Sequence, residues 1–563
     1  MSEDQISSSG PDGAPKQTAA APRRKQRTRA RRWPLVVAGS ATALLAAAAV
    51  AAGTVLPGAD ATARVDMPAQ VLPVGSSLAN CVGPTQLLSG SAAGADPEFS
   101  PNSSSTKALL GAVVLSNPDG VLPGSEVRAL GQGSAPFLTI AKAPANSAAA
   151  ASANPTAKAT VAPVTGVAKS KAGVVSGQGV TAQSVLETQP LNGQGTLAAG
   201  SVVVTSNDGD LQGMAAATCQ APSNDLWLAG ASTTVGRTAV LSLTNSTKSP
   251  ATVSLDLFGT NGTVNAPGGK GLVVAPGTSR SVVLAGLAPD QAQLAVHVKS
   301  TGGAVSAVIQ QSVLRGLTPG GVDYLAPVQS PATAQVVPGV RVQAPDAAAK
   351  ISAQNGYSDA TTALDVTVPG ARDAIVEVKA FGPSGQVALP NGGVFTAQAG
   401  KVTELSLVGL AQGTYSLSVT ADSAVTAGVR LINATKPGSA VDLAFAPSTS
   451  RLGDSHLALL PDGVTSSFAF TAPTGAATVS LVPVSAAGAL GAAKTMELKA
   501  GITTLVDPTA LLGPDAAAVL ISATGEPVYG TELLGAKDSA NIAVLPIAGA
   551  AADSSALNIT TGY

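Results

Sequence analysis

The chain has 563 residues, of which 45% are hydrophobic, 12% charged and 3% aromatic, and its formal net charge is −1. This length exceeds what one hydrophobic core usually organises, and about 150 residues per domain predicts three or four domains. With 61 Gly and 39 Pro residues, the chain exceeds the usual Gly and Pro share of roughly 12% without reaching that of collagen-like chains, which predicts a folded, turn-rich protein.

The N-terminal segment 1–34 carries a dense positive charge, with seven Arg and Lys residues between Arg23 and Arg32. The rest of the chain has no basic field large enough to hold nucleic acid, so nucleic-acid binding is not expected. Residues 1–22 are mostly Ser, Gly, Pro, Gln and Ala, which cannot bury enough apolar surface to fold. We expect residues 1–34 to form a disordered, basic cytoplasmic tail.

Residues 35–56 form an uncharged apolar stretch directly after the basic tail. As a helix this stretch is long enough to cross a hydrocarbon core of about 30 Å. The preceding basic residues predict a cytoplasmic N-terminus and extracytoplasmic C-terminal domains in the plasma membrane. The small residues of Ala59-Asp60-Ala61 also leave open a signal cleaved near Ala61 and a secreted product. Residues 57–74 are predicted to be a spacer.

Two cysteines, Cys81 and Cys219, lie on the predicted exported side. An even number of cysteines in an oxidising compartment predicts one disulfide between them, and the alternative is two buried free thiols. The first strands are expected at 81–88 and 108–115. Residues 141–171 are rich in Ala, Pro and Ser, and their prolines argue against a helix, so a flexible insertion is predicted there.

Later segments of the chain repeat one another. The stretch VSLDLFGTNG from Val253 matches VEVKAFGPSG from Val376, and two further matches follow in the same order about 120 residues apart. A weaker third copy begins near Val479, and SVVVTSNDGDLQGMAAATC from Ser201 followed by NDLWLAG resembles the end of a first one. Each copy is predicted to end in a short apolar closing strand, and Trp227 is aligned with Tyr324 and Phe445 in that strand.

Within these segments apolar and polar residues alternate with a period of two, as in LAVHVK from Leu294. This pattern predicts an all-β protein of tandem antiparallel β-sandwich domains, immunoglobulin-like or fibronectin-like, after one N-terminal transmembrane helix. A propeller is the alternative, but its blades are less than half as long as this repeat. The predicted domains are 75–232 (with the insertion), 233–335, 336–450 and 451–548, followed by a flexible tail, 549–563.

Residues suited to catalysis, cofactor binding or metal binding do not form a recognisable pattern. The two histidines, His297 and His456, are interpreted as a surface residue and as an isolated residue outside any triad. The glycine-rich stretch from Ala266 to Gly271 lacks phosphate-loop spacing, and no zinc or calcium motif is present. Trp227, the one tryptophan after the membrane segment, is interpreted as a core residue rather than a sugar-stacking platform. We therefore predict no enzyme activity, no catalytic residues, no metal site and no cofactor.

The basic tail, the Ala-rich anchor, the two-cysteine first copy and the stretch RGLTPGGVDYL from Arg315 together resemble an actinobacterial family of uncharacterised secreted or membrane-anchored proteins that carries a domain-of-unknown-function label. This resemblance implies no functional residues. The leading hypothesis is a non-catalytic extracytoplasmic scaffold or binding protein of the cell envelope, with the membrane as one partner and an envelope protein or glycan as another. The alternative is an accessory factor to, or an enzyme of, envelope glycan assembly whose site is built from loops. The oligomeric state stays open.

Overall fold

The computed structural model of the protein describes residues 70–71, 75–88, 103–131, 133–144, 169–192, 195–537, 539–547 and 556–557. The predicted tail 1–34, the membrane segment 35–56 and most of the insertion 141–171 lie outside these residues. Among the residues that are described, no helix has the length and hydrophobicity needed to cross a membrane. The described strands and helices, from Gln70 to Leu557, belong to one compact unit.

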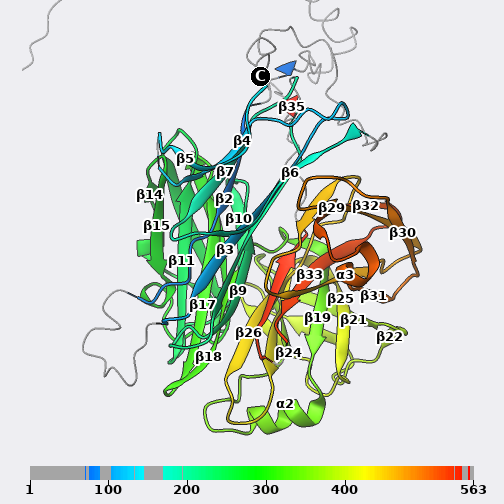
Figure 1. The fold of residues 1–563 in the computed structure, drawn as a ribbon. Coiled ribbons are helices and arrows are strands. Elements are labelled where there is room, and N and C mark those ends of the chain that lie inside the picture. Colours follow the sequence, from blue (N-terminus) through cyan, green and yellow to red (C-terminus); the bar gives the residue numbers. More distant parts are fainter. Residues whose placement is uncertain are drawn as a thin grey trace, which may run out of the picture. The chain divides into compact units, whose positions relative to one another are not determined.

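Strands with alternating exposure build this unit, which is all-β apart from short helices (Figure 1). In β12 (Ala251–Gly259), Val253, Leu255 and Leu257 are buried, and the residues between them are more exposed. Because side chains of a strand point alternately to its two faces, this pattern turns one apolar face toward a core. The strands pair antiparallel into two sheets per repeat, and four such repeats follow one another along the chain.

Repeat 1 pairs its strands in the orders β2-β7-β4-β5 and β6-β3-β8-β9. Leu110, Val127 and Val202, which come from both sheets, lie in its core. Its strands are β2 (Ser77–Cys81), β3 (Lys107–Leu115), β4 (Ser125–Ala129), β5 (Pro136–Ala141), β6 (Ala172–Gly179), β7 (Ser184–Thr188), β8 (Ala198–Ser206) and β9 (Gly213–Thr218).

Repeat 2 has the orders β10-β16-β12-β13, with β14 also on β12, and β15-β11-β17-β18. Its core joins Leu228 and Leu255 of one sheet to Leu241 and Ile309 of the other. Besides β12, its elements are β10 (Asp225–Ala231), β11 (Arg237–Asn245), β13 (Gly262–Val264), β14 (Leu272–Val274), β15 (Thr278–Val283), β16 (Leu294–Gly302), β17 (Ser306–Arg315), β18 (Thr318–Leu325) and the short 3-10 helices η4 (Pro267–Gly269) and η5 (Leu284–Gly286).

Repeat 3 is joined by one long strand, β25 (Gly413–Ala434). The first half of β25 pairs with β19 and β21, and its second half pairs with β20 and β26. The turn between these halves is replaced by Ala421-Asp422-Ser423-Ala424, which contains no Gly or Pro to end the strand. The other elements are β19 (Ala332–Val342), α2 (Pro345–Ser352), β20 (Ala363–Thr367), β21 (Ala374–Gly382), β22 (Gly385–Val387), β23 (Val394–Ala397), β24 (Val402–Ser406) and β26 (Val441–Pro447).

Repeat 4 has the orders β27-β32-β29-β30 and β31-β28-β33-β34. The side chain of Asp507 caps its short helix α3 by accepting a hydrogen bond from the Ala510 amide at 3.1 Å. Its elements are β27 (His456–Leu459), β28 (Thr465–Thr471), β29 (Ala477–Ser485), β30 (Lys494–Leu498), β31 (Thr503–Val506), α3 (Pro508–Leu512), β32 (Ala516–Gly525), β33 (Tyr529–Gly535) and β34 (Ile542–Pro546). Two short strands, β1 (Gln70–Val71) and β35 (Ala556–Leu557), pair with each other.

The four repeats share one strand order. For this comparison β13 and β14 count as one strand position, β22 and β23 count as one, and the two halves of β25 count as two. In each repeat the first strand then lies beside the sixth, and the second strand lies beside the seventh. In an immunoglobulin constant domain, by contrast, the first two strands lie in the same sheet. The repeats are therefore two-sheet sandwiches whose connectivity differs from the immunoglobulin order. The reason is that the connection after each first strand crosses to the opposite sheet.

The two segments aligned from the sequence, which begin at Val253 and Val376, form the same hairpin. In each, the strand ends in Phe-Gly and turns through a glycine with positive φ, Gly262 at 137° and Gly385 at 115°. The pairing is also the same, because the Phe and the Gly of each strand face corresponding positions of the returning strand. These pairs are Phe258 with Thr263, Gly259 with Gly262, Phe381 with Gln386 and Gly382 with Gly385.

Two details differ from the sequence-based expectations. The first strand of repeat 1 ends at Cys81 instead of beginning there, because Gly83 and Pro84 follow and Pro has no N–H to continue a ladder. Trp227 lies in β10, which pairs with β16 of repeat 2. It therefore belongs to a first strand and does not correspond to Tyr324 and Phe445, and the predicted boundary at 232/233 separates β10 from the sheet it joins.

The last strands of the four repeats pack in a closed circuit. β9 contacts β18, β18 contacts β26, β26 contacts β34, and β34 contacts β9. Repeats 1 and 4 are also joined by apolar side chains: Val113 packs in one cluster with Leu457, and Met214 packs in another with Leu545. The first and last repeats therefore close on each other.

Asp442 of β26 connects all four repeats. Its Oδ2 accepts hydrogen bonds from the backbone amides of Met214 in repeat 1 and Ile542 in repeat 4, each at 3.0 Å. Its Oδ1 accepts from the amide of Val322 in repeat 2 at 3.3 Å and from its neighbour Leu443 at 3.0 Å. The residue is 1% exposed. Burial raises the pKa of Asp442 to about 8, and the four amide donors act against that rise.

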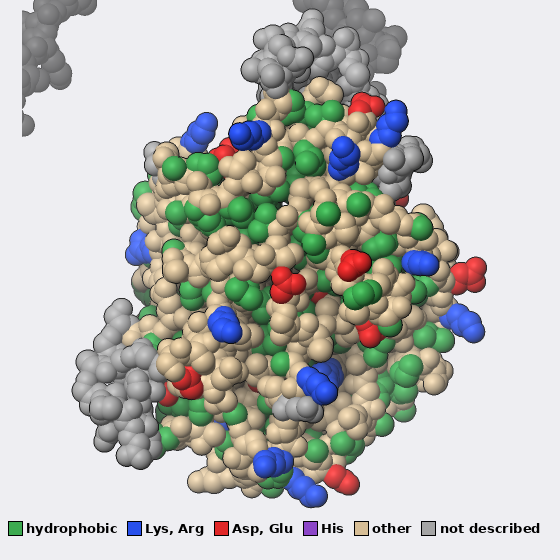
Figure 2. Space-filling view, in the orientation of Figure 1, with side chains coloured by type: hydrophobic (Ala, Val, Ile, Leu, Met, Phe, Trp, Pro, Cys, Tyr) green, Lys and Arg blue, Asp and Glu red, His purple; other side chains and the backbone are tan. Residues whose placement is uncertain are grey.

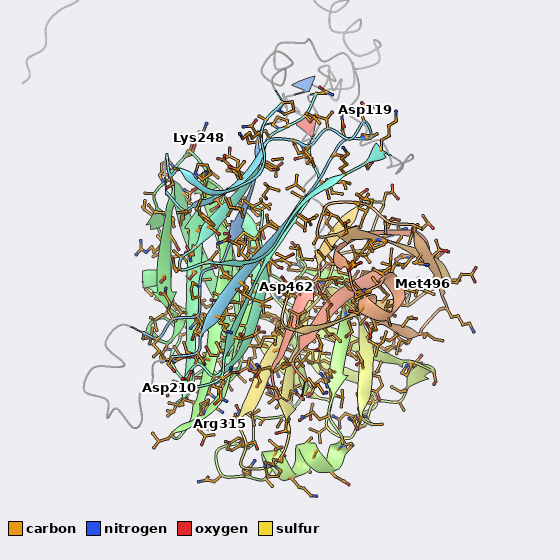
Figure 3. All side chains as sticks on the ribbon, in the orientation of Figure 1. Asp119, Asp210, Lys248, Arg315, Asp462 and Met496 are labelled. Carbon is orange, nitrogen blue, oxygen red and sulfur yellow. A yellow bond between two sulfur atoms is a disulfide. The ribbon has the colours of Figure 1, made fainter. Side chains whose placement is uncertain are left out.

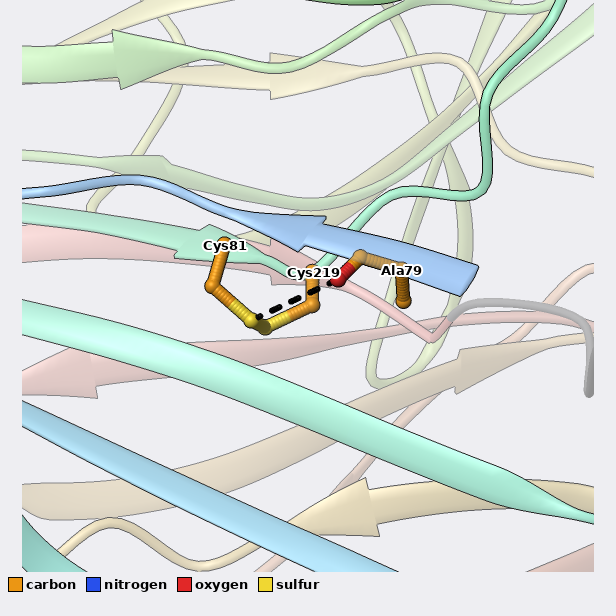
Figure 4. Close-up of a disulfide and its surroundings, with 3 residues drawn as sticks. All are labelled: Ala79, Cys81 and Cys219. Atoms are coloured by element: carbon orange, nitrogen blue, oxygen red, sulfur yellow. Dashed lines mark hydrogen bonds between the residues drawn. A yellow bond between two sulfur atoms is a disulfide. The ribbon is translucent and has the colours of Figure 1, made fainter. Parts of the chain in front are cut away.

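The predicted disulfide between Cys81 and Cys219 is present (Figure 4). It joins the end of β2 to the residue after β9, and these positions are 138 residues apart in sequence. The contact of 3.9 Å between Cys81 Sγ and the Ala79 carbonyl involves a bonded sulfur, which carries no proton to donate. The disulfide therefore fixes one sheet of repeat 1 to the other as a covalent link.

Candidate functional site

Both histidines have packing roles. The ring of His297 stacks on Trp227 with centroids 3.9 Å apart, and its Nε2 lies 3.1 Å from Asp225 Oδ1. Its side chain is 13% exposed, so it is more buried than the surface position predicted, because Trp227 lies directly opposite it on the same sheet face. Nε2 of His456 accepts the Gly453 amide at 2.7 Å. Within the described residues, no three His, Cys, Asp or Glu side chains cluster as metal ligands would.

Other sequence candidates are also structural. The glycine-rich stretch from Ala266 contains the short helix η4, and Lys270 Nζ contacts Asp256 Oδ1 at 2.5 Å. Trp227 is buried, 6% exposed, and stacks on Phe258 with centroids 5.6 Å apart. On the face seen in Figure 2, charged side chains are scattered and form no broad patch of one sign. Cavities and loops are therefore the better candidates for a functional site.

Repeat 3 contains an insertion that its neighbours lack. Residues 343–362 connect its first two strands, whereas residues 232–236 and 460–464 make the equivalent connections in repeats 2 and 4. The insertion begins with α2, which has Pro345 in its first turn, Asp346 near its N-terminus and Lys350 in its last turn. These positions match the backbone geometry and the dipole of a helix. Connecting segments held on a rigid scaffold often carry binding residues, so the insertion is a candidate site element.

The insertion reaches repeat 2 through Asp359. The carboxylate of Asp359 pairs with Arg237 at the start of β11 and with Arg315 at the end of β17. Arg315 also donates to the Gly356 carbonyl at 2.6 Å, and its guanidinium carbon lies 4.7 Å from the centre of the Tyr357 ring. Burial acts to raise the pKa of Asp359, but hydrogen bonds from Arg315 and Arg237 hold it below its usual value. In Figure 3, Arg315 lies at the tip of the β17–β18 hairpin.

Between this insertion, repeat 2 and repeat 3 lies a cavity of about 450 Å³, which we call the 2–3 cavity. This volume lies within the roughly 300–1,000 Å³ of small-molecule sites. Apolar residues and polar or charged residues both line it, as such sites require. The apolar residues include Val313, Leu325, Leu443, Ala444 and Phe445, and the polar ones include Ser232, Thr234, Arg237, Asp290, Gln293, Gln311, Ser358, Asp359 and Arg430.

Arg430 of β25 belongs to a charged group at this cavity. Its Nη2 donates to Glu404 Oε2 at 2.9 Å, and Gln293 of repeat 2 donates to the same oxygen at 2.7 Å. Asp365, which lies opposite Glu404 on the paired strand, is 2% exposed. Burial raises the pKa of Asp365 to about 7, with Arg430 lowering it and Glu404 raising it. Repeats 2 and 3 thus share a polar network, of which Arg430 and Gln293 line the cavity.

A second cavity, of about 260 Å³, lies among repeats 1, 2 and 4. Small apolar residues such as Ala198, Ala326 and Ala458 line it, together with Glu532. Glu532 is 2% exposed and accepts a hydrogen bond from Ser466 at 2.6 Å. Burial raises its pKa to about 8, so the carboxyl is largely neutral near pH 7.

The family model described as "Family of unknown function (DUF5719)" matches residues 174–509, which is more than half of the chain. The chain belongs to this family. The DUF5719 match runs from β6 to α3 and so includes every residue of the 2–3 cavity. No curated protein matches the chain.

Sequence reasoning did not find the 2–3 cavity. Its charged residues, Arg237, Asp290, Asp359 and Arg430, are far apart in sequence and stand in no motif. The available signal was the length of the connection between the first two strands of repeat 3 compared with those of its neighbours. The difference in length between these connections can be recognised only when the strand boundaries are known.

Proposed function

We propose that this DUF5719 protein is a non-catalytic binding protein of the cell envelope, anchored by residues 35–56, whose tandem sandwiches lie outside the membrane. The 2–3 cavity carries the proposal, because an insertion that repeats 2 and 4 lack contributes to its lining and because the cavity joins an apolar floor to polar side chains. The Cys81–Cys219 disulfide supports an oxidising compartment. The uncharged stretch after a basic tail supports a membrane anchor.

The closed circuit of four repeats favours binding through a rigid body. The interrepeat bonds of Asp442 fix the repeats to one another, so the insertion and repeat 2 present a preformed surface. Preformed sites lose less freedom on binding than flexible ones. In this proposal the cavity captures an envelope component, and the remaining repeats position it away from the membrane.

Site-specific photocrosslinking in living cells tests this proposal. A photoreactive residue at Val235, which is 92% exposed and lines the 2–3 cavity, is expected to give a defined adduct. The matched control is the same residue at Val273 of β14, which is 57% exposed on repeat 2 and does not line the cavity. Equal adduct patterns from both positions, or none from either, would argue against the cavity as the binding site. If only cytoplasmic proteins were crosslinked to the photoreactive residue, the result would argue against a location of the sandwiches outside the membrane.

A further inference from the structure

One guanidinium edge at the 2–3 cavity, formed by Nη1 of Arg430, makes no hydrogen bond to the described residues. Arg430 donates from Nε to the Thr361 carbonyl at 3.3 Å and from Nη2 to Glu404 at 2.9 Å, while its Nη1 has no hydrogen-bond partner among the described residues. The side chain is 18% exposed and lines the cavity. Because guanidinium donors form a rigid planar fork, the two bonded nitrogens fix the direction of the free one.

Two of the carboxylates around this edge are already engaged, whereas Oδ1 of the buried Asp365 has no hydrogen-bond partner among the described residues. Oε2 of Glu404 accepts from both Arg430 and Gln293, and the two oxygens of Asp359 accept from Arg237 and Arg315. Nη1 of Arg430 is a hydrogen-bond donor at the cavity that these carboxylates leave unbonded. A ligand that completes this arrangement has to supply an acceptor.

The floor beside this edge is apolar. Leu325, Leu443 and Phe445 are each at most 5% exposed yet line the cavity. Gly230 also lines it, and a Cβ there would overlap the Phe445 ring. An apolar body placed on this floor loses water contact on one side and so gains about 25 cal/mol for each Å² of apolar surface buried.

On the proposed function above, we propose that the 2–3 cavity binds an organic carboxylate, with the carboxylate group on Nη1 of Arg430 and an apolar body on the Leu325–Phe445 floor. A charge-assisted bond to a fixed guanidinium is about twice as strong as a neutral one. Asp290 and Asp359, which line the cavity, and Glu404, which is bonded to Arg430, disfavour a second negative charge. The ligand class is therefore a monoanion, and phosphate monoesters and cations fit less well.

Ligand-observed fluorine NMR on the full-length protein tests the proposal with three probes of matched shape: 4-fluorophenylacetate, the neutral 2-(4-fluorophenyl)ethanol, and 4-fluorobenzyl phosphonate. The acetate is expected to bind at least about tenfold more tightly than the alcohol, and the phosphonate more weakly than the acetate. Arg430→Gln is expected to abolish that preference. Arg430→Lys keeps the charge beside Glu404 but not the fork, and is expected to retain part of the preference.

Arg341→Gln is the matched control, because Arg341 is an exposed arginine of β19 in the same repeat that does not line the cavity. It is expected to leave all three affinities unchanged. If Arg430→Gln fails to fold, Arg430→Lys still decides the matter, since a purely structural Arg430 predicts equal loss for acid and alcohol. Equal affinity for acetate and alcohol in the wild type, or no binding of any probe, would overturn this proposal. Adducts at Val235 in cells would in that case leave the broader proposal intact.

Discussion

Asp442→Asn isolates the electrostatic contribution of the central carboxylate with almost no change in shape. In the wild type each carboxylate oxygen accepts two backbone amides, and the four amides come from all four repeats. In the variant one oxygen becomes an NH₂ group. Whichever way the new side-chain amide is oriented, its NH₂ group faces two backbone N–H donors. Water cannot replace the lost acceptor, because residue 442 is 1% exposed.

The magnitude follows from the cost of buried unsatisfied donors. Each costs about 1–3 kcal/mol, so two should lower the free energy of unfolding by about 2–6 kcal/mol. The wild-type carboxyl also bears its own burial cost, which raises its pKa to about 8. The comparison is therefore made at pH 9, where the wild-type group is ionised, and this burial cost places the expected loss toward the lower half of that range. Since the broken bonds join Met214, Val322 or Ile542 to repeat 3, the loss should fall on contacts between repeats more than on any one core.

Urea titration of the full-length protein, followed by tryptophan fluorescence and by far-ultraviolet circular dichroism, measures both effects. We expect a lower midpoint in Asp442→Asn and two probes that no longer coincide, because uncoupled repeats unfold separately. Asp119→Asn is the control, since Asp119 is exposed in a turn at the edge of repeat 1 (Figure 3). It should change stability by less than about 0.5 kcal/mol. A midpoint and slope identical to the wild type in Asp442→Asn would refute the role of this carboxylate in joining the repeats.

Three further outcomes are expected. Replacing both Cys81 and Cys219 with Ala should lower the free energy of unfolding by up to about 5 kcal/mol for a loop of 138 residues, and an unchanged urea midpoint would contradict this. Gly230→Ala should lower the free energy of unfolding by about 1–3 kcal/mol more than Gly316→Ala. Both glycines have positive φ, but only at position 230 would the added Cβ overlap the Phe445 ring. Equal melting temperatures of the two variants would contradict this. Glu532 has its pKa raised to about 8 in the folded state, so its contribution is greatest below the unfolded pKa near 4.3 and falls as pH rises toward 8, by at most about 1.4 kcal/mol per unit. In Glu532→Gln that slope should flatten in urea titrations between pH 5 and 8, and an unaltered slope would assign the pH dependence elsewhere.

Local features of the fold were predictable because they depend on neighbouring residues. Alternation of apolar and polar residues in segments such as Leu294–Lys299 gave the strands, and the Phe-Gly turns after Val253 and Val376 gave matching hairpins. The strand order was not predictable, since period-two alternation is the same whichever sheet a strand joins. Trp227 was misaligned for this reason, as a first strand and a closing strand look alike in sequence.

The arrangement of the repeats and the 2–3 cavity depend on contacts between distant residues. Asp323 and Asp442 each follow a Val in an apolar closing strand, and a carboxylate in such a strand is rarely fully buried without partners. That anomaly was a usable signal for a buried polar contact. Nothing in the sequence around Asp359 or Arg430 indicates that they come within reach of repeat 2. Asp359 lies in an insertion without a counterpart in repeats 2 and 4, and Arg430 reaches the cavity through the packing of β25.

The way the circuit closes explains why the acidic residue of the closing strand is absent from repeat 4. Asp323 of repeat 2 accepts a hydrogen bond from the Phe445 amide of repeat 3 at 2.8 Å, and Asp442 of repeat 3 accepts one from the Ile542 amide of repeat 4 at 3.0 Å. The same kind of carboxylate–amide bond therefore joins repeat 2 to repeat 3 and repeat 3 to repeat 4. The corresponding position in β34 is Ala543, which is buried among apolar side chains that include Met214 of repeat 1. A carboxylate at Ala543 would have its charge in an apolar cluster, at a cost of several kcal/mol. The circuit therefore uses carboxylate–amide links from repeat 2 to repeat 3 and from repeat 3 to repeat 4, and apolar packing where repeat 4 meets repeat 1.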